Sequence, residues 1–222
     1  MPTILITGAN RGMGLEFARQ YAAEGWRVLG TVRDPMAGRA LSEAGGEVYV
    51  CDVADPAQVA RLKASLAGVG LDILLLNAGI YGEKQDFGDV DPAAFMKVMA
   101  VNALAPLKLA EAFADQLTGR KIIAAVSSMM GAMSDNTSGG SYAYRAAKAA
   151  LNMVMKNLSI DLAPRGILTV ALSPGWVRTD MGGPDATLDA ATAVAGMRKV
   201  VGGLRAEDSG ALIHYDGSRL AW

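Results

Sequence analysis

The stretch ITGANRGMG, residues 6–14, stands where the first apolar run of the chain gives way to a helical pattern, and it carries glycines at positions 8, 12 and 14. At a strand-to-helix junction, glycine allows a tight turn and lets the backbone approach a pyrophosphate. The unpaired N–H groups of the helix N-terminus then stabilise the phosphate charge. Any α/β protein can use glycine to turn, so this motif alone leaves a plain structural turn open beside a nucleotide site.

Outward from this turn, short β-rich runs alternate with helical patterns along the whole chain. Nearly unbroken apolar strands indicate burial on both faces, as in a parallel sheet covered by helices. The sequence therefore predicts one α/β domain over residues 1–222, with a Rossmann-like, doubly wound, seven-stranded parallel sheet and helices on both faces. The predicted strands are TILIT, WRVLGTV, EVYVC, LDILLLN, KIIAAVSS, LTVALS and ALIHYD.

Start and stop signals place the later helices. Asp55 before Pro56 and Asp91 before Pro92 each pair an N-cap with proline at the first helical position. The segment 92–117 contains Pro106, which predicts a break close to Asn102. Another helix is expected over residues 142–162.

Composition and charge argue against several classes of binding partner. The 222 residues carry a formal net charge of -1, which provides no basic field for nucleic acid. Apolar runs such as ILLL at 73–76 are far too short to span a bilayer, and the Gly-rich turn at residue 8 leaves no room for a signal peptide. The single cysteine, Cys51, suits a reducing compartment, and no cluster has metal-ligand spacing. We expect a cytoplasmic protein with no membrane, nucleic-acid or metal partner.

Two tyrosines precede one lysine in SYAYRAAKAA, residues 141–150. Residues four apart share a helix face, whereas residues six apart do not, so Tyr144 and not Tyr142 should pair with Lys148. A neighbouring ammonium is expected to lower the pKa of the phenol toward the working range of an acid–base catalyst. A surface tyrosine and lysine at a common helical spacing is the structural alternative.

The turn spacing T-G-x-x-x-G-x-G, together with motifs that follow in order, resembles the short-chain dehydrogenase/reductase family. The resemblance covers nearly the whole chain, and RVLGTVRDP and PGWVRTDMGG look like the branch that contains the Sniffer carbonyl reductases and the bacterial C-factor proteins. The ordered motifs are Asp52-Val53, Asn77-Ala78-Gly79, Asn102, Ser127-Ser128, Tyr144-x-x-x-Lys148, and Pro174-Gly175 with Thr179.

The resemblance implies roles for individual residues. Tyr144 would donate a proton to a carbonyl oxygen and Ser128, with Ser127 as the alternative, would polarise it. Lys148 would bind the nicotinamide ribose, and Asn102 would hold a water that connects Lys148 to solvent. The implied cofactor-binding residues are Gly8, Asn10, Arg11, Gly12, Met13, Gly14, Arg33, Asp52, Val53, Asn77, Ala78, Gly79, Tyr144, Lys148, Pro174, Gly175, Val177 and Thr179.

The choice of nicotinamide depends on the end of the second strand. Asp34 lies near the distance at which an acid binds the ribose 2′-hydroxyl of NAD. Alignment by the strand instead places Val32 where NAD-preferring relatives carry the acidic residue, and Arg33 follows directly. Arginine binds a 2′-phosphate through bidentate, charge-assisted contacts. Arg11 adds a second positive charge. We therefore expect NADP(H) to be preferred, with NAD(H) as the alternative.

Apolar residues after the fifth and sixth strands are candidates for the substrate pocket, although methionine is as often core filler. These candidates are Met129, Met130, Met133, Trp176 and Met181. Ser128 and Tyr144 lie 16 positions apart, a few more than in most of the family, and the extra polar loop SDNTSGG would reshape substrate entry. The stretch TDMGGPDATLD is expected to act as a lid.

The sequence thus predicts an NADPH-dependent carbonyl reductase acting on apolar ketones or aldehydes, reversible in direction, with Tyr144 as general acid/base. A non-catalytic NADP(H)-binding signalling or sensor protein of the C-factor kind is the alternative. Relatives commonly pair through the helices that carry Asn102 and Tyr144, so a homodimer or homotetramer is expected.

Overall fold

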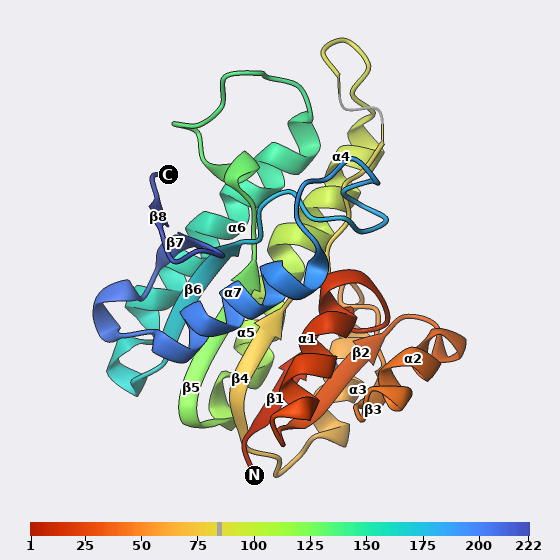
Figure 1. Cartoon of the computed structure of the whole chain (residues 1–222), viewed down its shortest axis with the longest axis vertical. Coiled ribbons are helices and arrows are strands. Elements are labelled where there is room, and N and C mark those ends of the chain that lie inside the picture. Colours follow the sequence, from red (N-terminus) through yellow and green to blue (C-terminus); the bar gives the residue numbers. More distant parts are fainter. Residues whose placement is uncertain (84–85) are drawn as a thin grey trace.

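The computed structural model describes residues 1–83 and 86–222, and in these residues eight strands form one sheet (Figure 1). The order is β3-β2-β1-β4-β5-β6-β7-β8. Because the chain order reverses between β1 and β4, ligands are expected at the carboxyl ends of these strands. The strands are β1 Thr3–Ile6, β2 Arg27–Val32, β3 Glu47–Val50, β4 Leu71–Leu76, β5 Leu117–Val126, β6 Leu168–Ser173, β7 Ala211–His214 and β8 Arg219–Leu220.

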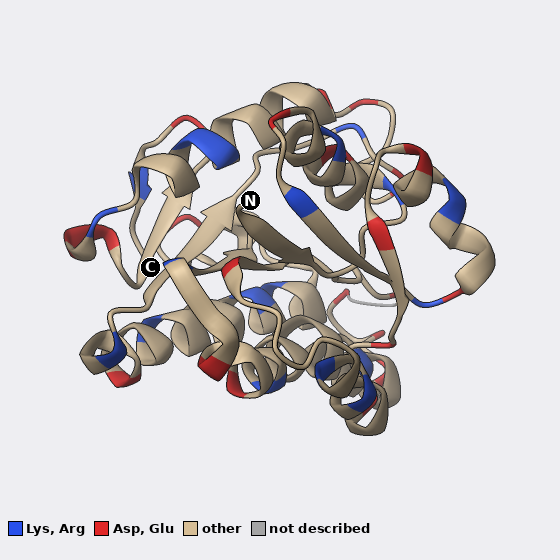
Figure 2. Ribbon diagram, turned by 90° about the horizontal axis from the view of Figure 1, so that it is seen from below, with Lys and Arg blue, Asp and Glu red and all other residues tan. Residues whose placement is uncertain are grey.

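Helices cover both faces of the sheet, which gives the layered arrangement seen end-on in Figure 2. Side chains alternate along each strand, so Ile4 and Ile6 pack against α1 and α7, whereas Leu5 packs in the core with α3, α5 and α6. The main helices are α1 Gly12–Ala23, α2 Arg39–Glu43, α3 Pro56–Ser65, α4 Pro92–Met99, α5 Ala105–Phe113, α6 Tyr142–Asp161 and α7 Ala190–Gly203. The shorter turns are η1 Pro35–Gly38, η2 Ala100–Leu104, η3 Ala114–Gln116, η4 Met129–Gly131, η5 Ala163–Arg165 and η6 Ala206–Asp208.

This architecture confirms the predicted single-domain, doubly wound α/β fold, but the prediction of seven strands was wrong. β8 is an eighth strand in the described part of the chain, and it pairs antiparallel with β7 through a hairpin that contains Gly217 at φ 93°. Asp-Gly at positions 216 and 217 is a hairpin signal that the sequence analysis did not use. The extra strand pairs with the side of β7 that would otherwise be an exposed sheet edge.

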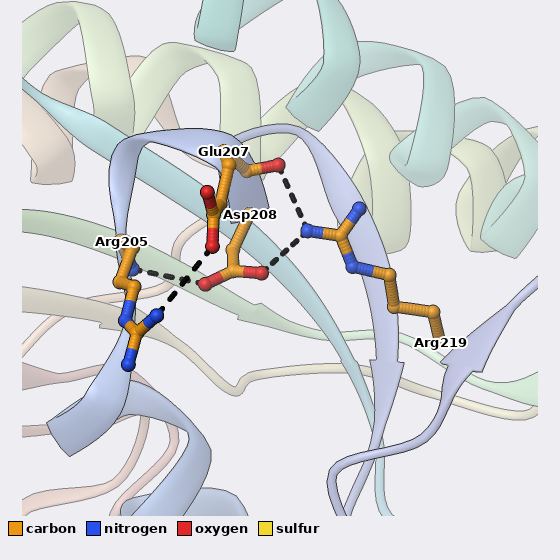
Figure 3. Close-up of polar contacts among 4 residues, drawn as sticks. All are labelled: Arg205, Glu207, Asp208 and Arg219. Carbon is orange, nitrogen blue, oxygen red and sulfur yellow. Dashed lines mark hydrogen bonds and ion pairs between the residues drawn. The ribbon is translucent and has the colours of Figure 1, made fainter.

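Ionic contacts hold β8 in place (Figure 3). The Arg219 guanidinium donates to the Glu207 carbonyl at 2.8 Å and also binds the Asp208 carboxylate. Asp208 in turn accepts from the Arg205 backbone N–H at 3.0 Å, and its pKa is lowered chiefly by the hydrogen bond from Arg219. The strand is thereby tied to η6 as well as to β7.

The break expected near Asn102 is present as the π-helical turn η2 between α4 and α5. Both predicted N-caps are also present, since the Asp55 and Asp91 carboxylates accept from backbone N–H groups of the first turns of α3 and α4.

Among the described residues, Pro92–Gln116 is the one helical span long and apolar enough to cross a bilayer by length and composition alone. It is interrupted by η2 and packs against α6 and the sheet, with Leu109 and Phe113 in the core. Helices in the core of soluble proteins are often as long and as apolar, so this span is weak evidence for a membrane segment.

Candidate active site

The predicted phosphate turn lies at the carboxyl end of β1, and steric limits fix its shape. A Cβ on Gly14 would lie 2.2 Å from the Gly8 carbonyl oxygen and 2.5 Å from Asn77 Nδ2, so only glycine fits there. In the described structure no side chain caps the N-terminus of α1, and its first turn carries no acidic residue. The backbone N–H groups of this turn therefore form a suitable site for an anion.

Asn77 joins the ends of β1 and β4. Its Nδ2 donates to the carbonyls of Thr7 at 2.9 Å and Gly8 at 3.1 Å. The Thr7 hydroxyl oxygen accepts from the backbone N–H groups of Asn77 and Ala78, at 3.0 and 3.1 Å. These bonds hold the Gly-rich turn against the central crevice of the sheet.

A hollow of about 360 Å³ extends from this turn past the ends of β2 and β3. Arg33 is exposed at its rim. The Asp34 carboxylate caps η1 by accepting from the Met36 N–H at 2.9 Å, and Arg11 pairs with Asp180. The predicted residues that line this hollow are Gly8, Asn10, Arg11, Gly12, Met13, Gly14, Arg33, Asp52, Val53, Asn77, Ala78, Gly79 and Thr179.

A neighbouring hollow of about 550 Å³ lies over the ends of β5 and β6, and Met13, Asn77 and Gly79 line both hollows. Tyr144, Lys148, Pro174, Gly175 and Val177, the remaining predicted cofactor residues, line this second one. The structure therefore brings the whole predicted cofactor set to one continuous crevice.

Tyr144 and Lys148 project from one face of α6, as their spacing predicts. Tyr144 is 8% exposed, whereas Tyr142 is 43% exposed and does not line the hollow. Lys148 Nζ lies 5.6 Å from the centroid of the Tyr144 ring and donates to the Val126 carbonyl at 2.7 Å.

The pKa of Tyr144 differs from the expectation that a neighbouring ammonium lowers it. Burial raises the pKa of Tyr144 to about 12, against a smaller lowering by its hydrogen bond with Ser128. Burial also lowers the pKa of Lys148 to about 8. Desolvation disfavours the charged form of each group, and the Lys148 ammonium donates to the Val126 carbonyl.

The structure separates the two candidate serines. Ser128 hydrogen-bonds with Tyr144, and its oxygen accepts from the Met130 N–H at 3.1 Å. The Ser127 hydroxyl is turned away, because it donates to Asn152 Oδ1 at 2.6 Å. The geometry favours Ser128 as the serine that faces the reacting group.

Asn102 lies behind the crevice and lines neither hollow. Its Oδ1 accepts from the Ile80 N–H at 2.9 Å and its Nδ2 donates to the Ile80 carbonyl at 2.7 Å. A Cβ on Gly79 would lie 3.3 Å from Asn102 Oδ1 and 3.8 Å from Lys148 Nζ. Asn102 therefore stabilises the loop after β4 close to Lys148, and both polar atoms of its side-chain amide are used there.

Four of the five predicted pocket residues line the larger hollow, and one does not. Met129, Met130, Trp176 and Met181 line the larger hollow. Met133 does not line it and is 77% exposed on the loop before α6. The prediction for Met133 failed because the chain turns outward after η4, and the sequence carries no signal for that turn.

Tyr81 is a lining residue that the sequence analysis missed. Its ring lies 4.7 Å from the Tyr144 ring, and its hydroxyl hydrogen-bonds with the Ser141 hydroxyl at 2.6 Å. Ser141 precedes α6 with a left-handed φ of 48°, which is uncommon outside glycine. An aromatic residue two positions after the Asn77-Ala78-Gly79 motif was the signal available in the sequence.

Within residues 1–83 and 86–222, no group of three or more His, Cys, Asp or Glu side chains is placed to hold a metal ion. The lone histidine, His214, is half-buried in β7, where its Nδ1 lies 3.2 Å from the Ser173 hydroxyl.

Comparison with known proteins gives consistent matches. Residues 2–188 match the short chain dehydrogenase family. The chain is 47% identical to the C-signal protein of Myxococcus xanthus, over 68% of this chain and 93% of that protein. The NADPH-bound carbonyl reductase from chicken fatty liver is 33% identical with a TM-score of 0.93, covering 100% of this chain and 99% of that one. The carbonyl reductase Sniffer of D. melanogaster is 32% identical with a TM-score of 0.92, and both chains are covered completely.

Proposed function

Since this chain belongs to the short-chain dehydrogenase/reductase family, we propose that it is an NADPH-dependent carbonyl reductase in which Tyr144 donates the proton. The family assignment makes it an NADP-dependent oxidoreductase, and its resemblance to the carbonyl reductase branch extends over the full chain. The observation that carries the proposal is the hydrogen bond between Ser128 and Tyr144 in a hollow that adjoins the glycine turn.

The crevice fits a dinucleotide with a 2′-phosphate. The uncapped start of α1 and the steric demand at Gly14 suit a pyrophosphate. Arg33 at the rim suits a 2′-phosphate, and the carboxylate of its neighbour Asp34 is already committed to the Met36 N–H. These features support NADP(H) over NAD(H). When bound, the nicotinamide would supply the hydride that reduces a ketone or aldehyde to an alcohol.

The protein would supply the proton and the positioning. The Tyr144 phenol, whose pKa burial raises from 10.0 to about 12, is protonated at neutral pH and would donate in the reductive direction. Ser128 shares a hydrogen bond with that phenol and would orient the carbonyl oxygen. Lys148, whose Nζ lies 5.6 Å from the centroid of the Tyr144 ring, would hold the ribose of the cofactor. Asn102 would maintain the backbone beside Lys148 through its two bonds to Ile80.

The lining of the larger hollow favours a neutral, apolar substrate. Among the described lining residues, Lys148 is the only one with a charged side chain, and it is buried. Met129, Met181 and Trp176 offer partly exposed apolar surface there. Unbranched methionines adapt to varied shapes, which supports a broad range of apolar ketones and aldehydes.

The test is oxidation of NADPH and of NADH by the purified protein across apolar ketones, aldehydes and quinones, with Tyr144→Phe alongside. Turnover with NADPH that falls by at least about a hundredfold in the variant is expected, since general acid catalysis contributes roughly 10²–10⁴-fold. Equal turnover by the wild type and the variant would overturn the assignment of Tyr144.

A second candidate function is supported by the 47% identity to C-signal: a non-catalytic NADP(H)-binding signalling or sensor protein. It would bind NADPH with no turnover on any substrate, and Tyr144→Phe would keep its biological output. The proposed reductase would instead lose turnover and keep cofactor affinity.

We also propose that the chain forms a homodimer or homotetramer through α4 and α6. Apolar side chains are exposed on these helices and on η2 between α4 and α5, namely Met96, Leu104, Met153 and Ile160. Sedimentation of the wild type and of Met153→Glu would test this, with a shift of the variant toward monomer expected. A cytoplasmic location is proposed as well, since Cys51 is free and buried, and cell fractionation would test it.

A further inference from the structure

Asn152 lies on α6 one turn beyond Lys148, and its side chain is 2% exposed. It lines neither hollow, so it has no direct access to a substrate or cofactor. Both polar atoms of its amide are used: Oδ1 accepts from the Ser127 hydroxyl at 2.6 Å, and Nδ2 donates to the Gly131 carbonyl at 3.2 Å. Buried polar groups of this kind are costly unless paired, so the arrangement is specific.

The two partners of Asn152 bracket Ser128. Ser127 directly follows β5, and Gly131 ends the short turn η4. The turn lies directly on α6, because a Cβ on Gly131 would be 2.7 Å from the Lys148 carbonyl carbon and 2.8 Å from its Cβ. The short segment from Ser127 to Gly131 is therefore fastened at both ends to the helix that carries Tyr144.

We propose that Asn152 is a positioning residue that holds Ser128 at hydrogen-bonding distance from Tyr144, an inference that rests on the proposed reductase function. Ser128 comes from one segment of chain and Tyr144 and Lys148 from another, and the Asn152 amide bonds the first segment on both sides of Ser128, in addition to the bond from Lys148 to the Val126 carbonyl. Reacting groups lose efficiency when displaced by about 1 Å, so this link sets the geometry on which turnover depends.

The chemistry of the amide explains why asparagine occupies this position. A neutral amide both donates and accepts, which Asn152 needs for Gly131 and Ser127 respectively. Aspartate would lose the donor and place a charge in a buried site, and leucine would lose both bonds at similar volume.

The first test compares Asn152→Ala with Thr169→Val in the full-length protein. Thr169 is a matched control, because its buried hydroxyl donates to the Met155 carbonyl at 2.9 Å and ties α6 to β6 away from Ser128. Asn152→Ala should lower kcat by about tenfold with unchanged NADPH affinity. Thr169→Val should lower the unfolding temperature and leave kcat unchanged.

Amide hydrogen exchange gives a readout that does not require turnover. The Gly131 and Ala132 N–H groups donate to the carbonyls of Ser128 and Met129, at 3.0 and 2.8 Å. Asn152→Ala should reduce their protection by at least about tenfold relative to Thr169→Val. Unchanged protection would overturn the link between Asn152 and the turn.

The decisive test is a double-mutant cycle with Ser128→Ala. Ser128→Ala alone should lower kcat by about a hundredfold, and adding Asn152→Ala should change it by less than about twofold, because the two residues act through one group. A further tenfold loss in the double variant would overturn the inference. If Asn152→Ala does not fold, Ser127→Ala is measured in the same cycle, where non-additivity supports the link and full additivity contradicts it. A wild type without turnover would instead overturn the proposed reductase, and the link would still stand or fall on the exchange data.

Discussion

The hollow beside the glycine turn and the hollow beside Tyr144 share Asn77 and Gly79, yet they are built from different material. The first is shaped by backbone, and a single methyl group on Gly14 would overlap the Gly8 carbonyl. The second presents apolar side chains that are absent from the first, namely Met129, Met130 and Trp176, on segments that follow β5 and β6. The difference fits the proposed roles of a rigid cofactor site in the first hollow and an adaptable substrate pocket in the second, which Tyr144 lines.

Gly14→Ala should have the largest effect, because nothing in the glycine turn can yield to the added methyl group. NADPH affinity is expected to fall by about a hundredfold, which is about 2.7 kcal/mol and lies within the roughly 1–3 kcal/mol that overpacking costs. Fluorescence titration with NADPH measures it. Gly202→Ala in α7 is the control, since its Cβ would meet nothing within 4 Å. Unchanged affinity in Gly14→Ala would contradict the steric account of the turn.

Arg33→Ala tests whether the backbone-built hollow also selects the cofactor. Loss of a charge-assisted contact should weaken NADPH binding by about 10–100-fold and leave NADH binding unchanged. Asp34→Asn should change neither, because that carboxylate caps η1. If Arg33→Ala weakened both cofactors equally, or Asp34→Asn weakened NADH, the arginine would not be the selecting group.

The free energy of unfolding should depend on pH through the two buried side chains Tyr144 and Lys148. Burial lowers the pKa of Lys148 from 10.5 to about 8, so the unfolded chain binds its proton more tightly and stability rises between pH 8 and about 10. Burial raises the pKa of Tyr144 from 10.0 to about 12, so its contribution falls above pH 10.

Lys148→Met isolates the lysine contribution. At pH 7 it should increase the free energy of unfolding by roughly 1–3 kcal/mol, and the gain should shrink toward pH 10 because the wild-type amine loses its proton in the folded state above pH 8. Urea unfolding at pH 7, 8, 9 and 10 measures this. A gain that is constant across these values would show that Lys148 is not the titrating group.

Met129→Ala should produce the smallest effect, because Met129 lines only the larger hollow and neighbouring side chains can fill the space. KM for an apolar ketone is expected to rise by less than about tenfold with kcat unchanged, in line with the loss of a few methylene contacts. Met133→Ala is the matched control, since Met133 is exposed and lies outside the lining. An equal change in KM for both variants would place Met133 in the pocket after all.

Features set by local rules could be predicted from the sequence. The periodicity of apolar residues predicts the alternation of strands and helices. N-cap chemistry predicts the capping roles of Asp55 and Asp91, and Pro106 predicts the break near Asn102. Tyr144 and Lys148 share a helix face because their spacing requires it. The Asp216-Gly217 turn before β8 was a local signal as well, but the short strand that follows it was overlooked.

Features that depend on contacts between distant segments could not be predicted. Tyr81 meets Tyr144 only because the loop after β4 crosses the start of α6. The rise in the pKa of Tyr144 follows from burial, which a motif does not encode. Ser127 is bonded to Asn152, which leaves Ser128 as the serine that hydrogen-bonds with Tyr144, and no sequence motif marks Asn152 on α6.

Tyr144 is proposed to deliver the proton in the hollow over the ends of β5 and β6. Single-turnover loss of NADPH fluorescence tests it most directly, with Tyr144→Phe compared against Tyr142→Phe, which removes an exposed phenol two residues away. The account predicts that Tyr144→Phe binds NADPH normally and slows the single turnover by at least about a hundredfold, while Tyr142→Phe matches the wild type. Equal rates in the two variants would contradict it.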